Sequence, residues 1–130
     1  MKKSERELLM RTREQAILVR TLRERCREEM QLGLRAFDPE AGGGCGGLPR
    51  TLDAQVIRRE EFMRILTREE RQLVLLEQRA RAVVDALPLQ LRSFCALYYL
   101  GALPLARVSE VMDRCPRTLK RYRRMLEEEA

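Results

Sequence analysis

The positions of glycine and proline divide this chain into two long uninterrupted stretches and several short ones. Neither residue occurs between Ser4 and Leu32, and residues 53–87 are again free of both. Between these stretches, five glycines and two prolines crowd into residues 39–49. Because these residues disfavour both helix interiors and strands, the spacing predicts two long helices, over about residues 4–34 and 53–87, joined by a Gly-rich flexible loop at about 36–52.

Apolar residues recur at helical spacing within both long stretches. The first stretch has a four-residue repeat with further apolar residues close by (Leu18, Leu22, Cys26, Met30; Leu8, Leu9, Ile17, Val19). The second is close to a heptad seam, interrupted by Glu70 and Glu77 (Val56, Met63, Leu66, Leu73, Ala80, Val84, Leu87). Such narrow stripes favour a partner helix over a globular core, and the simplest arrangement is a coiled-coil-like antiparallel hairpin. A homodimer through the long helices stays open as an alternative.

Residues 88–130 contain three short helical patterns. The first, "LQLRSFCALYYL", stops at Gly101, the second is "PLARVSEVM", and the third begins at Pro116. Pro104 and Pro116 both suit a first helical turn. The expected inner faces are Leu91, Phe94, Cys95, Leu97 and Tyr98, then Leu105, Val108, Ser109 and Met112. A short turn before the last of three helices is typical of a helix-turn-helix. The prediction is therefore an all-α chain, with a helical hairpin over 1–87 and a helix-turn-helix domain over 88–130.

Positive charge is concentrated and ordered in the last of these helices. The chain carries a formal net charge of +6, and residues 88–126 hold eight basic and two acidic side chains. On a helical wheel, Leu119, Tyr122 and Leu126 share one face, and the opposite face carries Arg117, Lys120, Arg121 and Arg124. Since a helix fits the major groove of B-form DNA, double-stranded DNA is the expected partner.

Roles follow from position along this helix, which is predicted at about 116–126. Its N-terminal part would meet base edges, which nominates Arg117, Thr118 and Arg121 for readout. Phosphates are assigned to Lys120, Arg124 and, in the preceding turn, Arg114. Arg123 lies near the apolar face, where its long side chain can reach outward.

The segment "LPLQLRSFCALYYLGALPLARVSEVMDRCPRTLKRYRRML", residues 87–126, resembles the region-four helix-turn-helix of bacterial sigma factors. With the long helices and the Gly-rich loop ahead of it, the whole chain resembles the short phage-encoded or prophage-encoded proteins related to the autolysin-regulator type of late transcription regulators. Three positions depart from the family pattern. Ser109 stands where Ala is usual, Asp113 where the turn has Gly, and Cys115 where Ser or Thr caps the recognition helix.

Three functions fit this pattern. The first is a sequence-specific DNA-binding transcription regulator of phage or prophage type. The second is a helical adaptor that docks on RNA polymerase or another protein through the long hairpin, because region-four domains touch polymerase as well as promoter DNA. The third is a DNA-packaging recognition protein like the small terminase subunits, which would form a ring-sized oligomer.

Several other classes are not expected. The chain has no His, and its four cysteines are nowhere two or three residues apart, so neither a metal site nor a cofactor is predicted. Without an evident nucleophile or acid–base pair, no catalytic residue can be named and an enzyme is not expected. No stretch is long and apolar enough for a membrane span, so the sequence predicts a cytoplasmic protein with reduced thiols, of which Cys45 in the Gly-rich loop is the most open to reagents.

Overall fold

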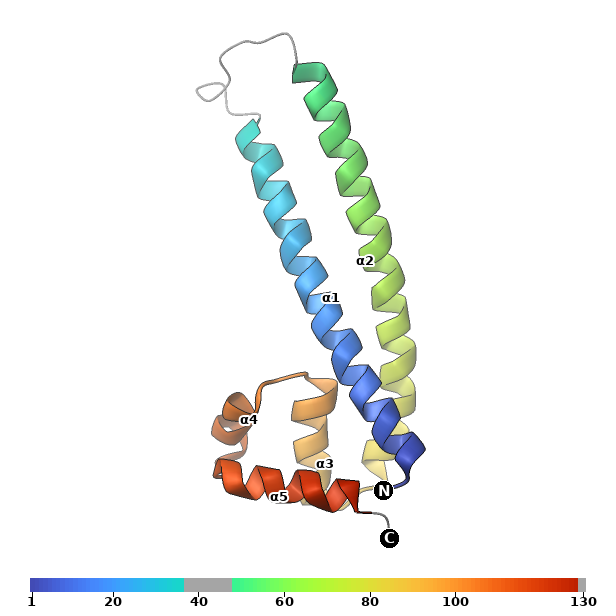
Figure 1. The fold of residues 1–130 in the computed structure, drawn as a ribbon, viewed down its shortest axis with the longest axis vertical. Coiled ribbons are helices and arrows are strands. Elements are labelled where there is room, and N and C mark those ends of the chain that lie inside the picture. The colour runs from blue at the N-terminus through green and yellow to red at the C-terminus, as the bar shows by residue number, and fades with distance from the viewer. Residues whose placement is uncertain (37–47, 129–130) are drawn as a thin grey trace. The chain divides into compact units, whose positions relative to one another are not determined.

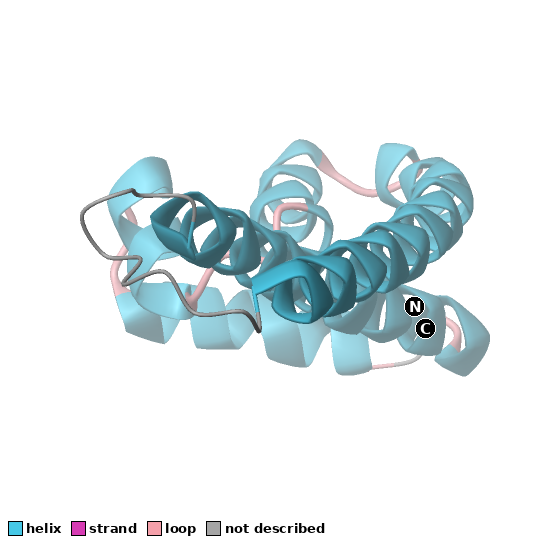
Figure 2. Cartoon of the chain, turned by 90° about the horizontal axis from the view of Figure 1, so that it is seen from above, coloured by secondary structure: helices cyan, strands magenta, loops and turns pink. Residues whose placement is uncertain are grey.

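Figure 1 shows the fold, a computed structural model that describes residues 1–36 and 48–128. Within these ranges every regular element is a helix, as Figure 2 makes plain, so the predicted all-α class is confirmed. The elements in chain order are α1 (Lys3–Ala36), α2 (Leu48–Asp85), α3 (Leu89–Cys95), η1 (Ala96–Leu100), α4 (Leu105–Met112) and α5 (Pro116–Glu127).

The two long helices form close to where the glycine and proline pattern predicts them. The predicted loop end at residue 52 is wrong, because α2 already begins at Leu48. Pro49 therefore lies in the first turn of α2, where a residue without an N–H is tolerated because that donor has no intrahelical acceptor. At the other end, α2 stops at Asp85, shortly before Pro88. The Gly-rich segment over 37–47, with Cys45, lies outside the described residues.

The chain forms two compact units. One unit consists of Met1–Ile17 and Arg71–Ala130, and the other of Leu18–Glu70. The first therefore combines the start of α1 and the end of α2 with α3, η1, α4 and α5. The domain boundary predicted at residue 87 differs from this division, because it lies at the break between α2 and α3. The two predicted domains, 1–87 and 88–130, stay a prediction.

The first unit has a continuous core to which all of its helices contribute. Phe94, Cys95, Val108 and Leu119 have no exposed surface. The core is aromatic at its centre, since the ring centroids of Phe94 and Tyr98 stack 5.4 Å apart. Its other buried members are Leu9, Ala80, Val84, Leu91, Tyr98, Tyr99, Tyr122 and Leu126.

The second unit is a two-helix seam in which α1 and α2 run antiparallel (Figure 1). Its buried apolar side chains, among those described, are Val19, Cys26 and Leu66. The predicted seam is wrong at Val56 and Met63, which are 47% and 44% exposed. In α1 the predicted apolar stripe is wrong at Leu18 and Met30, which are exposed. Ile17, which belongs to the first unit, is also exposed.

The short helices bury the faces that their sequence predicts. Val108 of α4 is fully buried, and Leu105, Ser109 and Met112 are half-buried. The inner face of α3 and η1 is as predicted except that Leu97 is only half-buried. None of the helices in the described ranges has an apolar stretch of the length that crossing a bilayer requires.

Candidate nucleic-acid interface

The turn between α4 and α5 accommodates two of the unusual residues. Asp113 follows α4 in the left-handed conformation, with φ 54° and ψ 47°. Asp is one of the few side chains other than glycine that visits this region readily. The Ser109 carbonyl accepts hydrogen bonds from the N–H groups of both Asp113 and Arg114, the latter at 3.2 Å. Asp113 therefore ends α4 in the conformation for which glycine is usual.

Ser109 contributes a second contact to the same turn. Its hydroxyl donates a hydrogen bond to the carbonyl of Arg114. An Ala at this position would pack similarly but could not make that bond. Ser109 thus links the last full turn of α4 to the residue that precedes the N-cap of α5.

The start of α5 is set by Pro116 and Cys115. Pro116 is the first helical residue, as predicted. Cys115 occupies the N-cap and makes no side-chain cap hydrogen bond to the backbone. Its Sγ lies 3.1 Å from Oγ1 of Thr118 instead, and this hydrogen bond is the main cause that lowers the pKa of the exposed Cys115 thiol.

The two faces of α5 differ as the helical wheel predicts. Leu119, Tyr122 and Leu126 are buried in the core of the first unit. The four cations predicted on the opposite face are all exposed. A surface cleft of about 480 Å³ lies along this face and is lined by Arg117, Thr118, Lys120, Arg121 and Arg124. The structure therefore brings together five of the six predicted DNA-binding residues.

No acidic side chain in the described part of the chain neutralises the cations of this cleft. Among the described residues, no carboxylate lies within ion-pair distance of Arg117, Lys120, Arg121 or Arg124. Arg114, the sixth predicted residue, is exposed in the turn before α5 and does not line the cleft. Arg123 is half-buried at the edge of the apolar face, 3.8 Å from Glu127 and with its guanidinium 5.8 Å from the ring centroid of Tyr98. On the exposed face of α5, these four positive charges thus have no ion-pair partner among the described residues.

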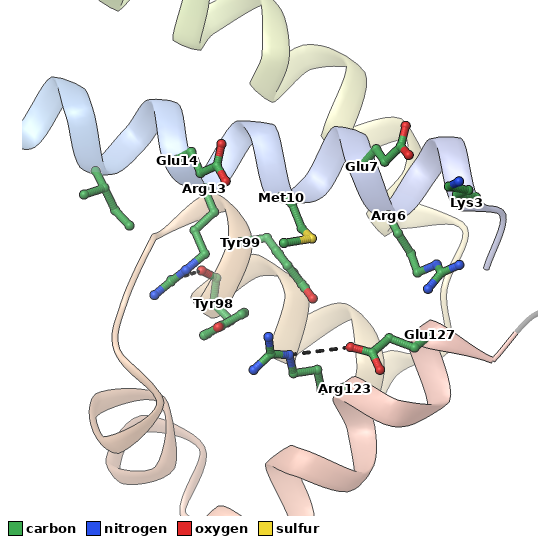
Figure 3. Close-up of a pocket in the computed structure, with 11 residues that line it drawn as sticks. Lys3, Arg6, Glu7, Met10, Arg13, Glu14, Tyr98, Tyr99, Arg123 and Glu127 are labelled. Atoms are coloured by element: carbon green, nitrogen blue, oxygen red, sulfur yellow. Dashed lines mark hydrogen bonds and ion pairs between the residues drawn. The ribbon is translucent and has the colours of Figure 1, made fainter.

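A neighbouring region of the first unit was not predicted from sequence. A cavity of about 340 Å³ lies where α1 faces η1 and α5 (Figure 3). At its edge, Arg13 of α1 donates hydrogen bonds through Nη1 to the carbonyls of Tyr98, at 2.6 Å, and Leu103, at 3.0 Å. In the sequence, Arg13 is one of many arginines on a charged helix, and no spacing distinguishes it. The other lining residues are Lys3, Arg6, Glu7, Met10, Glu14, Ile17, Tyr99, Arg123 and Glu127.

Burial raises the pKa of two side chains in the core of the first unit. It raises the pKa of the Cys95 thiol to about 12, in keeping with the prediction that Cys95 is a small core side chain. Burial also raises the pKa of the Tyr99 hydroxyl to about 12. In the parts of the chain that the structure describes, no three side chains among His, Cys, Asp and Glu converge closely enough to hold a metal ion.

Comparison of the chain with models of known protein families, with curated proteins and with solved structures finds no match.

Proposed function

We propose that this chain is a sequence-specific DNA-binding transcription regulator of phage or prophage type, with α5 as its recognition helix in the major groove. The observation that carries the proposal is the exposed face of α5, where four cations that have no acidic partner among the described residues line a cleft while the opposite face is buried. A helix fixed on one side and positively charged on the other suits the groove and its phosphates.

The local geometry supports the resemblance to sigma region four. Three consecutive helical segments precede the acidic end of the chain, and the left-handed residue Asp113 separates the last two. Ser109 and Asp113, which depart from the family pattern, both take part in the turn. These departures are therefore compatible with a recognition helix held in place for DNA.

Roles are assigned by position on α5. Arg117 and Arg121 stand four residues apart near its start and reach base edges, where Arg pairs with guanine in bidentate fashion. Thr118 can still contact DNA, because a hydroxyl that bonds Cys115 keeps further hydrogen-bonding capacity. Lys120 and Arg124, together with Arg114 in the turn, contact phosphates and fix the register on the duplex.

Selection from a random duplex library at two salt concentrations tests the proposal. Wild type should enrich a motif that the Arg117→Ala/Arg121→Ala variant loses. Arg25→Ala/Arg27→Ala is the matched control, because it removes the same charge from exposed positions of α1. Motif enrichment that survives the loss of Arg117 and Arg121 would rule out α5 as the reading helix. If the chain binds DNA without enriching a motif, and this binding is lost at modest salt, then α5 is only a general contact for polyanions.

A protein-binding adaptor, with RNA polymerase as partner, is the second candidate. The cavity between α1 and η1 favours it, since Met10 and Ile17 in its wall are 51% and 41% exposed. Exposed apolar side chains around a hollow are typical of interaction surfaces. Two results together would favour the adaptor over the regulator. The chain would co-purify with polymerase, with Met10→Glu abolishing the association, and it would shift no DNA duplex at low salt.

A further inference from the structure

The π-helical segment η1 forms an unusual end to the first short helix. Its defining hydrogen bond runs from the N–H of Gly101 to the carbonyl of Ala96, five residues back, at 2.8 Å. Such turns are rare and occur frequently at functional sites. Here the wider turn buries two consecutive tyrosines, Tyr98 and Tyr99, in the core that also receives the apolar face of α5.

Arg13 of α1 holds this segment by three contacts. Its Nη1 donates to the carbonyl of Tyr98 and to that of Leu103, which lies beyond the end of η1. Its guanidinium also lies 4.0 Å from the ring centroid of Tyr98, a cation–π distance. Arg13 thus supplies a charged donor to one carbonyl within η1 and to one just beyond its end.

The Tyr98 ring connects Arg13 to the recognition helix. Arg123 of α5 approaches the same ring at 5.8 Å and also pairs with Glu127 (Figure 3). The Phe94 ring stacks on Tyr98 and lies 6.2 Å from Tyr122 of α5. A displacement of Tyr98 would therefore change the contacts that position α5, at Arg123 and, through Phe94, at Tyr122.

We propose that Arg13 is a positioning residue for the DNA-reading face of α5: by holding η1 and the Tyr98 ring, it fixes the orientation at which α5 presents Arg117 and Arg121. This inference rests on the function proposed above. Arg13 itself lines the cavity on α1 and not the α5 cleft, so it acts on DNA through Tyr98 and Arg123. The N-terminal part of α1 thus contributes to DNA binding by positioning α5.

Binding of the enriched duplex by the full chain tests the positioning role. Arg13→Gln should weaken binding on the order of tenfold, since it removes charge-assisted hydrogen bonds and the cation–π contact. Arg13→Lys should be nearly as weak, because an ammonium lacks the planar fork that reaches the carbonyls while lying over the ring. Arg11→Gln, the matched control on an exposed position of α1, should change affinity by about twofold or less.

Each alternative role predicts a different pattern. A direct phosphate contact would be restored by Arg13→Lys, and Arg13→Gln would lower the salt slope by about one. A purely stabilising role would lower the melting temperature of Arg13→Gln and leave its affinity unchanged below the transition. Either pattern would overturn the proposal.

Amide spectra of the free protein separate this proposal from the proposed function. Arg13→Gln and Arg13→Lys should both shift the signals of α5 from Arg117 to Arg124 and speed hydrogen exchange at Gly101, whereas Arg11→Gln should not. Unchanged α5 signals in both Arg13 variants would refute the positioning role even if the wild type binds DNA. Shifted signals in a chain that binds no duplex would leave Arg13 as the residue that orients α5 and would instead defeat the assignment to DNA.

Discussion

The two compact units differ in how they bury apolar side chains. In the first, helices from both ends of the chain enclose a cluster with Phe94, Val108 and Leu119 at its centre, all fully buried. In the second, two helices share a seam in which Val19, Cys26 and Leu66 are the described apolar residues that are buried. A residue between two helices has solvent on its open sides, so a seam excludes less water than a core of several helices. The unit that carries the charged face of α5 therefore has the denser core.

The largest expected effect comes from removing the centre of the first core. Phe94→Ala should destabilise the first unit by about 3–5 kcal/mol, because Phe94 is fully buried and its ring stacks on Tyr98. Denaturant unfolding followed by circular dichroism measures the loss. Leu89→Ala is the control, since Leu89 is 72% exposed and should change stability by no more than about 0.5 kcal/mol.

The second unit offers the matching test of the comparison. Leu66→Ala should cost about 2 kcal/mol, at the low end for a buried leucine, because an open seam can close over the missing side chain. Local stability of the second unit can be followed by hydrogen exchange of amides between Leu18 and Glu70. A loss at Leu66 as large as that at Phe94 would show that the seam is as well packed as the core.

Gly101, at the end of η1, tests how tightly the first unit is packed. A Cβ at this position would lie 2.8 Å from the carbonyl oxygen of Leu97, a backbone atom that cannot move aside alone. Gly101→Ala should therefore destabilise the first unit by about 1–3 kcal/mol, as overpacking does elsewhere. It should also weaken the proposed DNA binding, because η1 carries Tyr98, whose ring centroid lies 5.8 Å from the guanidinium of Arg123 on α5. Thermal unfolding with parallel binding measurements checks both, and Gly101→Ala with wild-type stability would show that η1 can relax at no cost.

Sequence periodicity predicted α5 well because its signal is local. Leu119, Tyr122 and Leu126 recur at helical spacing and are buried, and the cations predicted on the opposite face are exposed. Such amphipathicity is decided within one helix and needs no knowledge of its neighbours. Asp113 is the first of three residues between α4 and α5, and its left-handed conformation ends α4 at the position where the region-four pattern has glycine.

The contacts of Arg13 and the seam positions could not be predicted in this way. Periodicity shows that Val56 and Met63 are apolar but not how far the partner helix extends over them, and both are exposed. The donation from Arg13 to the Tyr98 carbonyl joins residues that are 85 positions apart in sequence. No local pattern specifies such a pair, because tertiary packing selects it. The role of the α1 start beside α5 therefore comes from the structure alone.

A substitution at Ser109 tests the turn between α4 and α5, and its expected effect on stability is smaller. Ser109→Ala removes the hydrogen bond to the Arg114 carbonyl and should cost about 0.5–1.5 kcal/mol, the usual net worth of such a bond. Since Ala is usual at this position in the sigma region-four pattern that the chain resembles, the proposed DNA binding should keep the same motif preference in the variant. Thermal unfolding and motif selection test the two halves of this prediction. A lost motif would mean that the Ser109 hydroxyl sets the orientation of α5 as well as the stability of the turn.

The ion pair in the seam should have the smallest effect. Nε of Arg23 lies 3.1 Å from Oε1 of Glu70, and the two side chains are 56% and 39% exposed. Because solvent screens such a pair, a double-mutant cycle of Arg23→Ala and Glu70→Ala should give a coupling of about 0.2–1 kcal/mol that decreases with added salt. Hydrogen exchange in the second unit measures it, with Arg25→Ala as an exposed control. A larger coupling that resists salt would mean that the seam excludes water around Glu70, and the contrast between the two units would then be smaller than their buried apolar residues indicate.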